Sequence, residues 1–173
     1  MINQEIILTS DECQSIIDMN TGFSPSKVMY NDAKGRTGNY RTSYDSYTET
    51  SDTIKDLLLP KLSKYNITSL PSHFSILRYK VGQEFKKHRD QGGLYESTSE
   101  RYKTLIIQLS DNYKGGEFII WDDDEVICDT TIGNMILFSA KLLHQAKPVL
   151  EGVRYSMVYF LKMNNFNINK SII

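Results

Sequence analysis

The most constraining feature of the sequence is a series of short apolar runs that follow Pro71 and are separated by turn residues. Each run is rich in Ile, Leu, Val, Phe or Tyr and is too short for a typical buried helix, which favours β-strands. Gly115-Gly116, Asp122 to Asp124 and Ile132 to Asn134 fit the turns between them. Many short strands at this spacing predict a β-sandwich or barrel. The runs are FSILRYK (74–80), KTLIIQLS (103–110), GEFIIW (116–121), EVIC (125–128), NMILFS (134–139) and RYSMVYFLK (154–162).

The N-terminal part has a different pattern. A short apolar strand leads into a helix that begins with the capping box Thr9 to Glu12. Residues 22–51 are rich in Ser, Thr, Asn, Tyr and Gly and predict a long functional loop or short irregular strands. Residues 52–66 have helical spacing, with a break expected near Leu59 because Pro60 lacks a backbone donor. The fold class is therefore mainly β with flanking helices.

Charge and composition exclude several classes of protein. The formal net charge is −1, which predicts neither a nucleic-acid binder nor a membrane-surface protein. No apolar run is long enough to cross a bilayer, and the polar N-terminal residues lack the layout of a secretory signal. Cys13 and Cys128 are too few for a disulfide framework, so we expect buried free thiols. We expect a cytoplasmic or other intracellular location.

His88, Asp90 and His144 are candidate metal ligands. His88 and Asp90 are one residue apart, so in an extended segment their side chains leave the same face. His144 follows the 134–139 strand after a short loop, and a barrel can bring that loop beside the end of an earlier strand. Two imidazoles and one carboxylate with open positions suit a non-haem Fe(II) oxygenase.

Arg154 and Ser156 extend this pattern. They share one face of the last predicted strand, ten residues beyond His144. A guanidinium donates two parallel hydrogen bonds to a carboxylate, and a neighbouring hydroxyl adds a third donor. The alternative for Arg154 is an ordinary surface salt bridge.

Three segments carry a resemblance to a known family. RYKVGQEFKKHRD, LIIQLSDNYKGGEF and GNMILFSAKLLHQAKPVLEGVRYSMVYF, in this order within residues 73–162, resemble the prolyl 4-hydroxylase-like family of 2-oxoglutarate and Fe(II)-dependent dioxygenases. The tripeptide Arg41 to Ser43 is similar to an element ahead of the barrel in prolyl hydroxylases. Asn134 stands where the family often has an acidic residue, and Arg154 where many members have lysine.

The resemblance implies a fold and a set of roles. It implies a single dioxygenase domain over residues 1–173, with a helical and loop part over about 1–70 and a double-stranded β-helix (jelly-roll) core over about 71–163. The iron ligands would be His88, Asp90 and His144, with Arg154 on the distal carboxylate of 2-oxoglutarate. The cofactors would be Fe(II) and 2-oxoglutarate, with ascorbate as a candidate addition. Tyr79, Ser156 and Gln108 would line the co-substrate pocket beside Arg154.

The reaction implied is hydroxylation of a C–H bond, with succinate and carbon dioxide as co-products. Prolyl hydroxylation of a protein or peptide is the leading hypothesis, with dioxygen as the other partner and no membrane. Nucleic acid is disfavoured because demethylases of this superfamily carry a second arginine at the position of Phe160. We expect the loop at about 31–50 to close over the site.

Other functions stay open at this stage. The prime substrate could be another peptidyl residue or a small molecule. The domain could be a non-catalytic metal-binding module, although such a module would not need all four polar residues of the site. A zinc-dependent hydrolase could use the same three ligands, but it would not need Arg154 or Ser156. The basic residues around His88 (Lys80, Lys86, Lys87 and Arg89) could form a positive rim for an acidic peptide or nucleic acid, and the alternative is an ordinary solvated face. His73 and the acidic turn at 122–125 have ordinary structural explanations.

Overall fold

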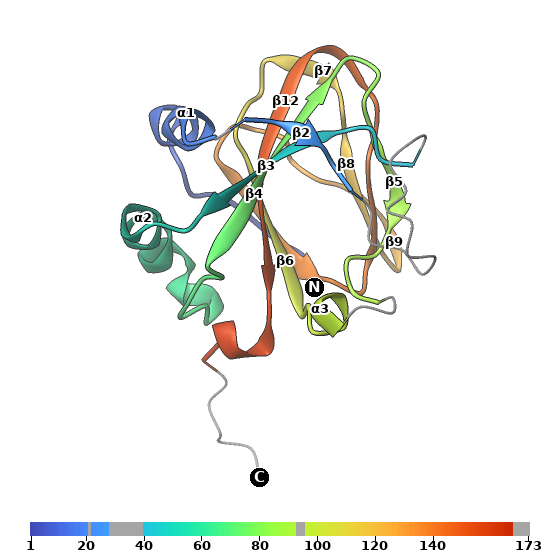
Figure 1. The fold of residues 1–173 in the computed structure, drawn as a ribbon. Coiled ribbons are helices and arrows are strands. Elements are labelled where there is room, and N and C mark those ends of the chain that lie inside the picture. The colour runs from blue at the N-terminus through green and yellow to red at the C-terminus, as the bar shows by residue number, and fades with distance from the viewer. Residues whose placement is uncertain (21, 28–39, 93–95, 168–173) are drawn as a thin grey trace.

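A computed structural model describes residues 1–20, 22–27, 40–92 and 96–167. The chain forms strands and helices in an order that places most helical residues before the main strands (Figure 1). The helices are α1 (Ser10–Asp18), α2 (Asp52–Leu62) and α3 (Glu96–Ser99), with short 3-10 helices η1 (Ser63–Tyr65) and η2 (Met163–Asn165). The strands are β1 (Asn3–Ile6), β2 (Ser24–Pro25), β3 (Tyr44–Glu49), β4 (His73–Lys80), β5 (Phe85–His88), β6 (Lys103–Gln108), β7 (Tyr113–Gly115), β8 (Phe118–Asp122), β9 (Asp124–Ile127), β10 (Asn134–Ser139), β11 (Leu143–Ala146) and β12 (Val149–Leu161).

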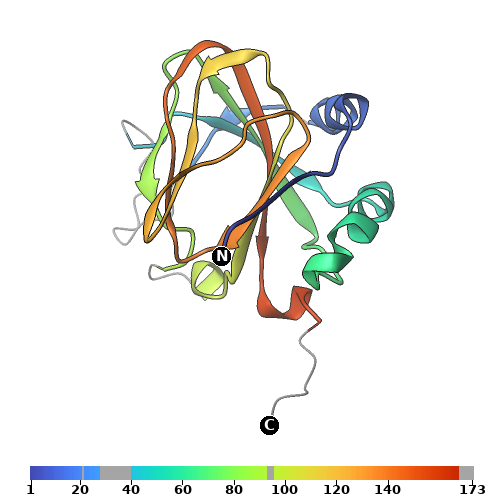
Figure 2. The ribbon, with the colours of Figure 1, turned by 180° about the vertical axis from the view of Figure 1, so that it is seen from behind.

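The strands form two antiparallel sheets. The large sheet has the order β1-β10-β6-β12-β4-β3-β2, and β7 also pairs with β12. The small sheet has the order β5-β11-β8-β9. Figure 2 shows β1 beside β10 at the edge of the large sheet, far from it in sequence. The two antiparallel sheets and the helices beside them confirm the predicted mainly β fold with a jelly-roll core and flanking helices.

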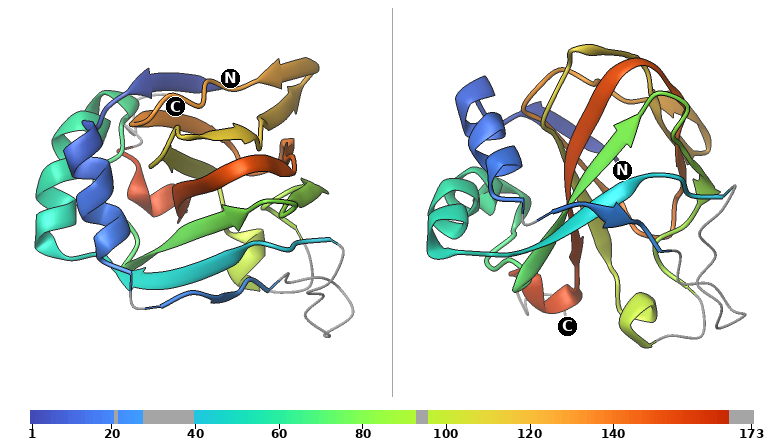
Figure 3. Two further views of the ribbon diagram at one scale, coloured as in Figure 1. Left: turned by 90° about the horizontal axis from the view of Figure 1, so that it is seen from above. Right: turned by 45° about the horizontal axis from the view of Figure 1, so that its top comes forward.

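The large sheet is buried on both faces, and side-chain alternation divides its apolar residues between two cores. Ile107, Leu137 and Met157 face outward and pack with Ile16 and Leu58 of the helices. Residues of opposite parity on the same strands face inward, toward the small sheet. Figure 3 shows α1 and α2 side by side against the large sheet. Double burial explains why these strands read as nearly continuous apolar runs. The inward residues include Leu77, Tyr79, Ile106, Ile136, Phe138 and Val158.

The predicted first helix is confirmed, whereas the predicted break in the second is wrong. Thr9 caps α1: its hydroxyl accepts from the Glu12 backbone, and the Glu12 carboxylate accepts from the Thr9 backbone. Helix α2 continues past Pro60 to Leu62. Proline costs a helix one hydrogen bond, but here the burial of Leu58 and Leu62 holds the last turn in place.

Short strands account for the other differences from prediction. β3 lies within the predicted loop and pairs with β4 along all six of its residues. His144 lies on β11 rather than in a loop, whereas His88 ends β5, in agreement with the extended segment expected for His88 and Asp90. These strands have no strong apolar alternation, so cross-strand pairing determines them rather than local sequence. The predicted lid at 31–50 lies partly outside the described residues, and its portion at 44–49 is sheet.

Two further predictions concern the thiols and the membrane. Cys13 and Cys128 are both buried and free, as predicted. Burial raises the pKa of the Cys13 thiol to about 11 and that of the Cys128 thiol to about 12. Within the described residues, the helices are all too short or too polar to span a bilayer.

Gly133 joins the N-terminal segment to the core. Its carbonyl accepts from the backbone of Ile7, and its φ of +80° is in the left-handed region. A Cβ at this position would lie 2.0 Å from the Leu8 carbonyl oxygen. Gly82 has nearly the same φ, +79°, but a Cβ there would meet nothing within 4 Å. An alanine at Gly82 would thus introduce backbone strain alone, whereas an alanine at Gly133 would introduce both backbone strain and a steric clash.

We predict that Gly133→Ala lowers the free energy of unfolding much more than Gly82→Ala does. The Gly82 variant carries only left-handed backbone strain, about 1 kcal/mol. The Gly133 variant adds displacement of the β1–α1 segment, for a total of at least about 3 kcal/mol. Urea unfolding of both variants measures the difference. Equal losses would show that the close approach at Leu8 does not constrain the fold.

Candidate metal centre and anion pocket

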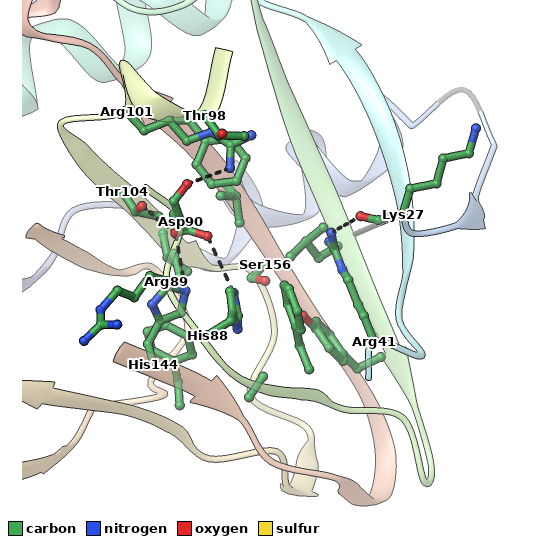
Figure 4. A pocket seen from close by; sticks show the side chains of 18 of the residues that line it. Lys27, Arg41, His88, Arg89, Asp90, Thr98, Arg101, Thr104, His144 and Ser156 are labelled. Atoms are coloured by element: carbon green, nitrogen blue, oxygen red, sulfur yellow. Dashed lines mark hydrogen bonds and ion pairs between the residues drawn. The ribbon is translucent and has the colours of Figure 1, made fainter. Parts of the chain in front are cut away.

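The three predicted metal ligands come together at one end of the small sheet. His144 on β11 pairs directly with His88 on β5, so both imidazoles leave neighbouring positions. Asp90 follows two residues after His88, and its backbone N–H donates to the carbonyl of Ala140. One potential ligand atom from each of the three residues lies within 4.8 Å of the others. Figure 4 shows the three side chains converging in one pocket.

Backbone carbonyls fix the orientation of both imidazoles. His88 Nδ1 lies 2.7 Å from the Lys86 carbonyl oxygen, and His144 Nδ1 lies 3.0 Å from that of Leu142. A carbonyl oxygen only accepts hydrogen bonds, so each Nδ1 carries the proton. Each Nε2 therefore faces the Asp90 carboxylate: His88 Nε2 lies 3.5 Å from Oδ1, and His144 Nε2 lies 3.3 Å from Oδ2. A hydrogen bond from the ring nitrogen that does not face the metal holds a metal-binding histidine in the correct tautomer.

The third ligand is buried and held in its ionised form. Asp90 is 8% exposed, and Thr104 Oγ1 donates to its Oδ2 over 2.6 Å. Burial by itself raises the pKa of Asp90, but the adjacent His144 and His88 lower it well below its usual range. Burial lowers the pKa of His88, which favours the neutral ring that a metal requires. Burial by itself lowers the pKa of His144 too, but the Asp90 charge and hydrogen bond raise it above its usual value, so a metal bound here would displace a proton from that ring. Two imidazoles and one carboxylate suit Fe(II).

Arg154 lies in the same pocket and has no anionic partner among the residues that the structure describes. It is 2% exposed, and no carboxylate among the described residues forms an ion pair with it. Its Nε has no hydrogen-bond partner there either. Its guanidinium carbon lies 5.2 Å from the ring centre of Tyr79 and 5.9 Å from that of Phe118. A buried cation without a counter-ion is strongly destabilising, so this pocket fits an anionic ligand.

The other predicted pocket residues surround Arg154. Tyr79 pairs with Arg154 across β4 and β12, and Ser156 lies two residues further along β12 on the same face. Both line the pocket, whereas Gln108, which pairs with Ser156, is fully buried behind it. The amide nitrogen and oxygen of Gln108 both lack partners in the described part of the chain.

Gly116 makes room for the arginine. A Cβ at Gly116 would lie 3.3 Å from Arg154 Cδ and 3.2 Å from a ring carbon of Tyr113. Its φ of +66° belongs to the predicted Gly115-Gly116 turn. The turn therefore also lets the β12 arginine pack closely against the end of β7.

Several lining residues were not among the candidates. Thr104 shares the inward face of β6 with Ile106, which was the available signal for its role. Arg101 donates to the Asp90 backbone carbonyl at 3.3 Å and lies over the Phe160 ring at 3.6 Å. Arg41, the first residue of the Arg-Thr-Ser element, lies 4.6 Å from the centre of the Phe85 ring. Nothing local to the sequence indicated Arg101.

Comparison with known proteins identifies the family. Residues 74–162 match the model of the 2OG-Fe(II) oxygenase superfamily, and this range includes His88, Asp90, His144 and Arg154. A PKHD-type hydroxylase of Rippkaea orientalis is 33% identical over 89 residues, which cover 49% of this chain and 40% of that protein. A PKHD-type hydroxylase of Methylobacterium nodulans is 29% identical over 128 residues, or 65% and 56% of the two chains. The chain thus spans about half the length of the curated relatives it matches.

Solved structures support the same fold. A Pseudomonas putida prolyl-4-hydroxylase aligns with a TM-score of 0.68 at 13% identity, over 93% of this chain and 92% of that one. A Trichoplax adhaerens prolyl hydroxylase, solved with a peptide fragment of hypoxia inducible factor, aligns with a TM-score of 0.70 at 14% identity, over 95% and 84%. At these identities the structures are evidence of fold alone. From the family model, the chain belongs to the 2OG-Fe(II) oxygenase superfamily, whose cofactors are Fe(II) and 2-oxoglutarate.

Proposed function

We propose that this chain is a 2-oxoglutarate- and Fe(II)-dependent dioxygenase that hydroxylates a prolyl residue of a protein or peptide. The observation that carries the proposal is the buried, unpaired Arg154 in the same pocket as His88, Asp90 and His144. A metal-binding module has no use for a buried cation beside its metal. An enzyme that must hold a dicarboxylate next to iron needs this combination.

The roles follow from the contacts. His88, Asp90 and His144 hold Fe(II), and Arg154 binds the distal carboxylate of 2-oxoglutarate. When both are bound, they supply the oxidising power: dioxygen is reduced, the keto acid is converted to succinate and carbon dioxide, and the substrate gains a hydroxyl group. The Tyr79 and Ser156 hydroxyls are placed to donate to the same co-substrate. Ascorbate and a role for Gln108 stay predictions.

Apolar side chains shield the reacting centre. Phe85 stacks on the His88 ring at 3.4 Å between ring centres, and Phe138 packs edge-on to His144 at 4.9 Å. Phe118 and Ile106 complete the wall between the histidines and Arg154. This wall excludes water from the co-substrate, which strengthens the charge-assisted bonds that orient it.

A zinc hydrolase fits the pocket less well. Such enzymes use a metal-bound water, commonly with a carboxylate that moves its proton. Asp90 is the only acidic residue among the described residues that line this pocket, and it is already a ligand. The buried Arg154 also has no task in that reaction.

A peptidyl substrate is supported by the similar proteins. The curated relatives are hydroxylases by name, and the structural neighbours include prolyl hydroxylases, one of them solved with a peptide. In this chain Arg41, Arg101 and Phe160 line the pocket and are only partly buried, which is consistent with access for a side chain that extends from a larger molecule.

The proposal predicts a coupled reaction. Incubation with Fe(II), 2-oxoglutarate, dioxygen and a library of proline-containing peptides is expected to add one oxygen atom to the substrate for each succinate formed. Mass spectrometry of the peptides and quantification of succinate measure both. Oxygen incorporated into a residue other than proline would support the dioxygenase activity but contradict proline as the hydroxylated residue. Peptide cleavage without succinate would instead favour the hydrolase.

Thr104 provides a test of the metal centre. We predict that Thr104→Val weakens metal binding by roughly tenfold or more, because it removes the hydrogen bond that holds Asp90 Oδ2. Thr104→Ser keeps the hydroxyl and is the matched control, with near wild-type affinity expected. Calorimetric titration with Mn(II) in place of Fe(II) measures the affinity. Equal affinity in the Val and Ser variants would contradict a role for this bond.

A further inference from the structure

The charge around the site is distributed very unevenly. The whole chain has a formal net charge of −1, with 20 basic and 21 acidic residues. The site pocket and an adjoining hollow are nonetheless bordered by six basic side chains against two acidic ones, Asp45 and Asp90. The basic residues are Lys27, Arg41, Arg89, Arg101, Arg154 and Lys162. The field at the entrance is therefore positive although the molecule is not.

Much of this positive charge lacks a partner. In the proposed function Arg154 binds 2-oxoglutarate and Asp90 binds the metal. Of the remaining cations, Arg41 has Asp45 at 3.8 Å, and Lys162 pairs with Glu100. Lys27, Arg89 and Arg101 form no ion pair with any carboxylate in the described ranges. These three charges remain available after the cofactors are bound.

Arg101 is the best placed of the three. It lies at the border of both hollows, stacked on Phe160 and bonded to the backbone carbonyl of the ligand Asp90. Burial lowers the pKa of Arg101, the nearby Asp90 charge raises it in part, and the Arg41 charge lowers it. Figure 4 shows Arg101 and Arg41 on opposite sides of the pocket. An anionic group between them would relieve the repulsion and accept hydrogen bonds from a planar donor.

The adjoining hollow extends the site away from the metal. It shares Arg41, Arg101 and Phe160 with the pocket and continues past His73 to Tyr47. The Tyr47 and His73 rings stack at 4.6 Å with an angle of 4° between them, and Tyr47 is 68% exposed. An exposed aromatic face next to unpaired cations suits a chain with apolar and acidic side chains in alternation.

We propose that the substrate is an acidic peptide. A Glu or Asp close to the hydroxylated residue binds Arg101, and the rest of the peptide continues through the adjoining hollow to Tyr47. This inference rests on the proposed function, since it names the substrate class for the same site. A peptide is favoured over nucleic acid because nucleic-acid affinity comes from many phosphate contacts over an extended basic surface. Among the described residues, only three cations without an ion pair border the site, Lys27, Arg89 and Arg101, and the molecule as a whole is slightly acidic.

The test compares three short fluorescent peptides with the same Gly- and Ser-based sequence around a central proline. The residues that flank the proline are Glu, Gln or Lys. Anisotropy with Mn(II) and 2-oxoglutarate present measures binding without turnover. The Glu peptide is expected to bind about tenfold or more tightly than the Gln peptide, and the Lys peptide more weakly than both. Added salt should reduce the Glu preference.

Variants locate the preference. Arg101→Gln is expected to remove most of the difference between the Glu and Gln peptides. Lys27→Glu reverses an exposed charge. It is expected to reduce the difference in affinity between the Glu and Gln peptides and to improve binding of the Lys peptide, and a merely structural effect would not improve that binding. Lys64→Gln is the matched control, because Lys64 is exposed, pairs with Glu5 and lines neither hollow. It should bind all three peptides as the wild type does.

The outcomes separate this inference from the proposed function. Equal binding of the three peptides, or an unchanged preference in Arg101→Gln, overturns the acidic-peptide assignment. Tighter binding of a short oligothymidylate than of the Glu peptide would overturn it in favour of nucleic acid. Calorimetry of 2-oxoglutarate with the Mn(II)-loaded protein is the independent readout. Absence of that binding would count against the dioxygenase itself, whatever the peptides show.

Discussion

The unpaired guanidinium of Arg154 is the constraint on which the rest of the site depends. Strand β12 lies between β4 and β6 in the large sheet, so an inward side chain at its centre is removed from water on all sides. A charge in such a position is stable only with a counter-ion or a set of strong acceptors. Among the described residues no carboxylate pairs with it, and its guanidinium carbon lies near the Tyr79 and Phe118 rings. The protein is therefore complete electrostatically only with an anion bound.

The site also joins the two sheets. His88 and His144 belong to the small sheet, whereas Arg154 and Thr104 belong to the large one. Asp90 connects them, because its carboxylate faces both imidazoles and accepts the Thr104 hydrogen bond. Neither sheet alone holds the metal ligands, their support and the anion pocket. Outward packing of the helices on the large sheet leaves its inner face free for this chemistry.

Sequence reasoning predicted the parts of the molecule that local chemistry determines. Spacing and side-chain type predicted the Thr9 capping box and the long apolar strands. They also predicted that His88 and Asp90 share one face of an extended segment. Arg154 and Ser156 share a face because strand periodicity is two. The short strand β11, which carries His144, was missed because neighbouring strands define it. Helix α2 continued past Pro60 because tertiary packing of its last turn outweighed the lost hydrogen bond.

The entrance to the site was the least predictable part. Arg101 follows α3 and precedes β6, and nothing in its sequence neighbours indicates a pocket. Its position over Phe160 and beside Asp90 arises only when β6 and β12 pair. The basic residues flanking His88 were grouped together from sequence, yet only Arg89 of that group borders the pocket, while Lys87 lies over Trp121 at 3.5 Å. The basic residues that are neighbours in the sequence are therefore not the same residues that gather around the pocket.

One measurement tests the central claim most directly: the visible charge-transfer absorbance that forms when a keto acid chelates Fe(II) in the absence of oxygen. The wild-type protein should develop the band on addition of Fe(II) and 2-oxoglutarate. His144→Ala should lose it, and Arg154→Ala should require a much higher concentration of 2-oxoglutarate to reach it. A folded, iron-loaded protein without the band, or a band with the same 2-oxoglutarate dependence in Arg154→Ala, would contradict the account.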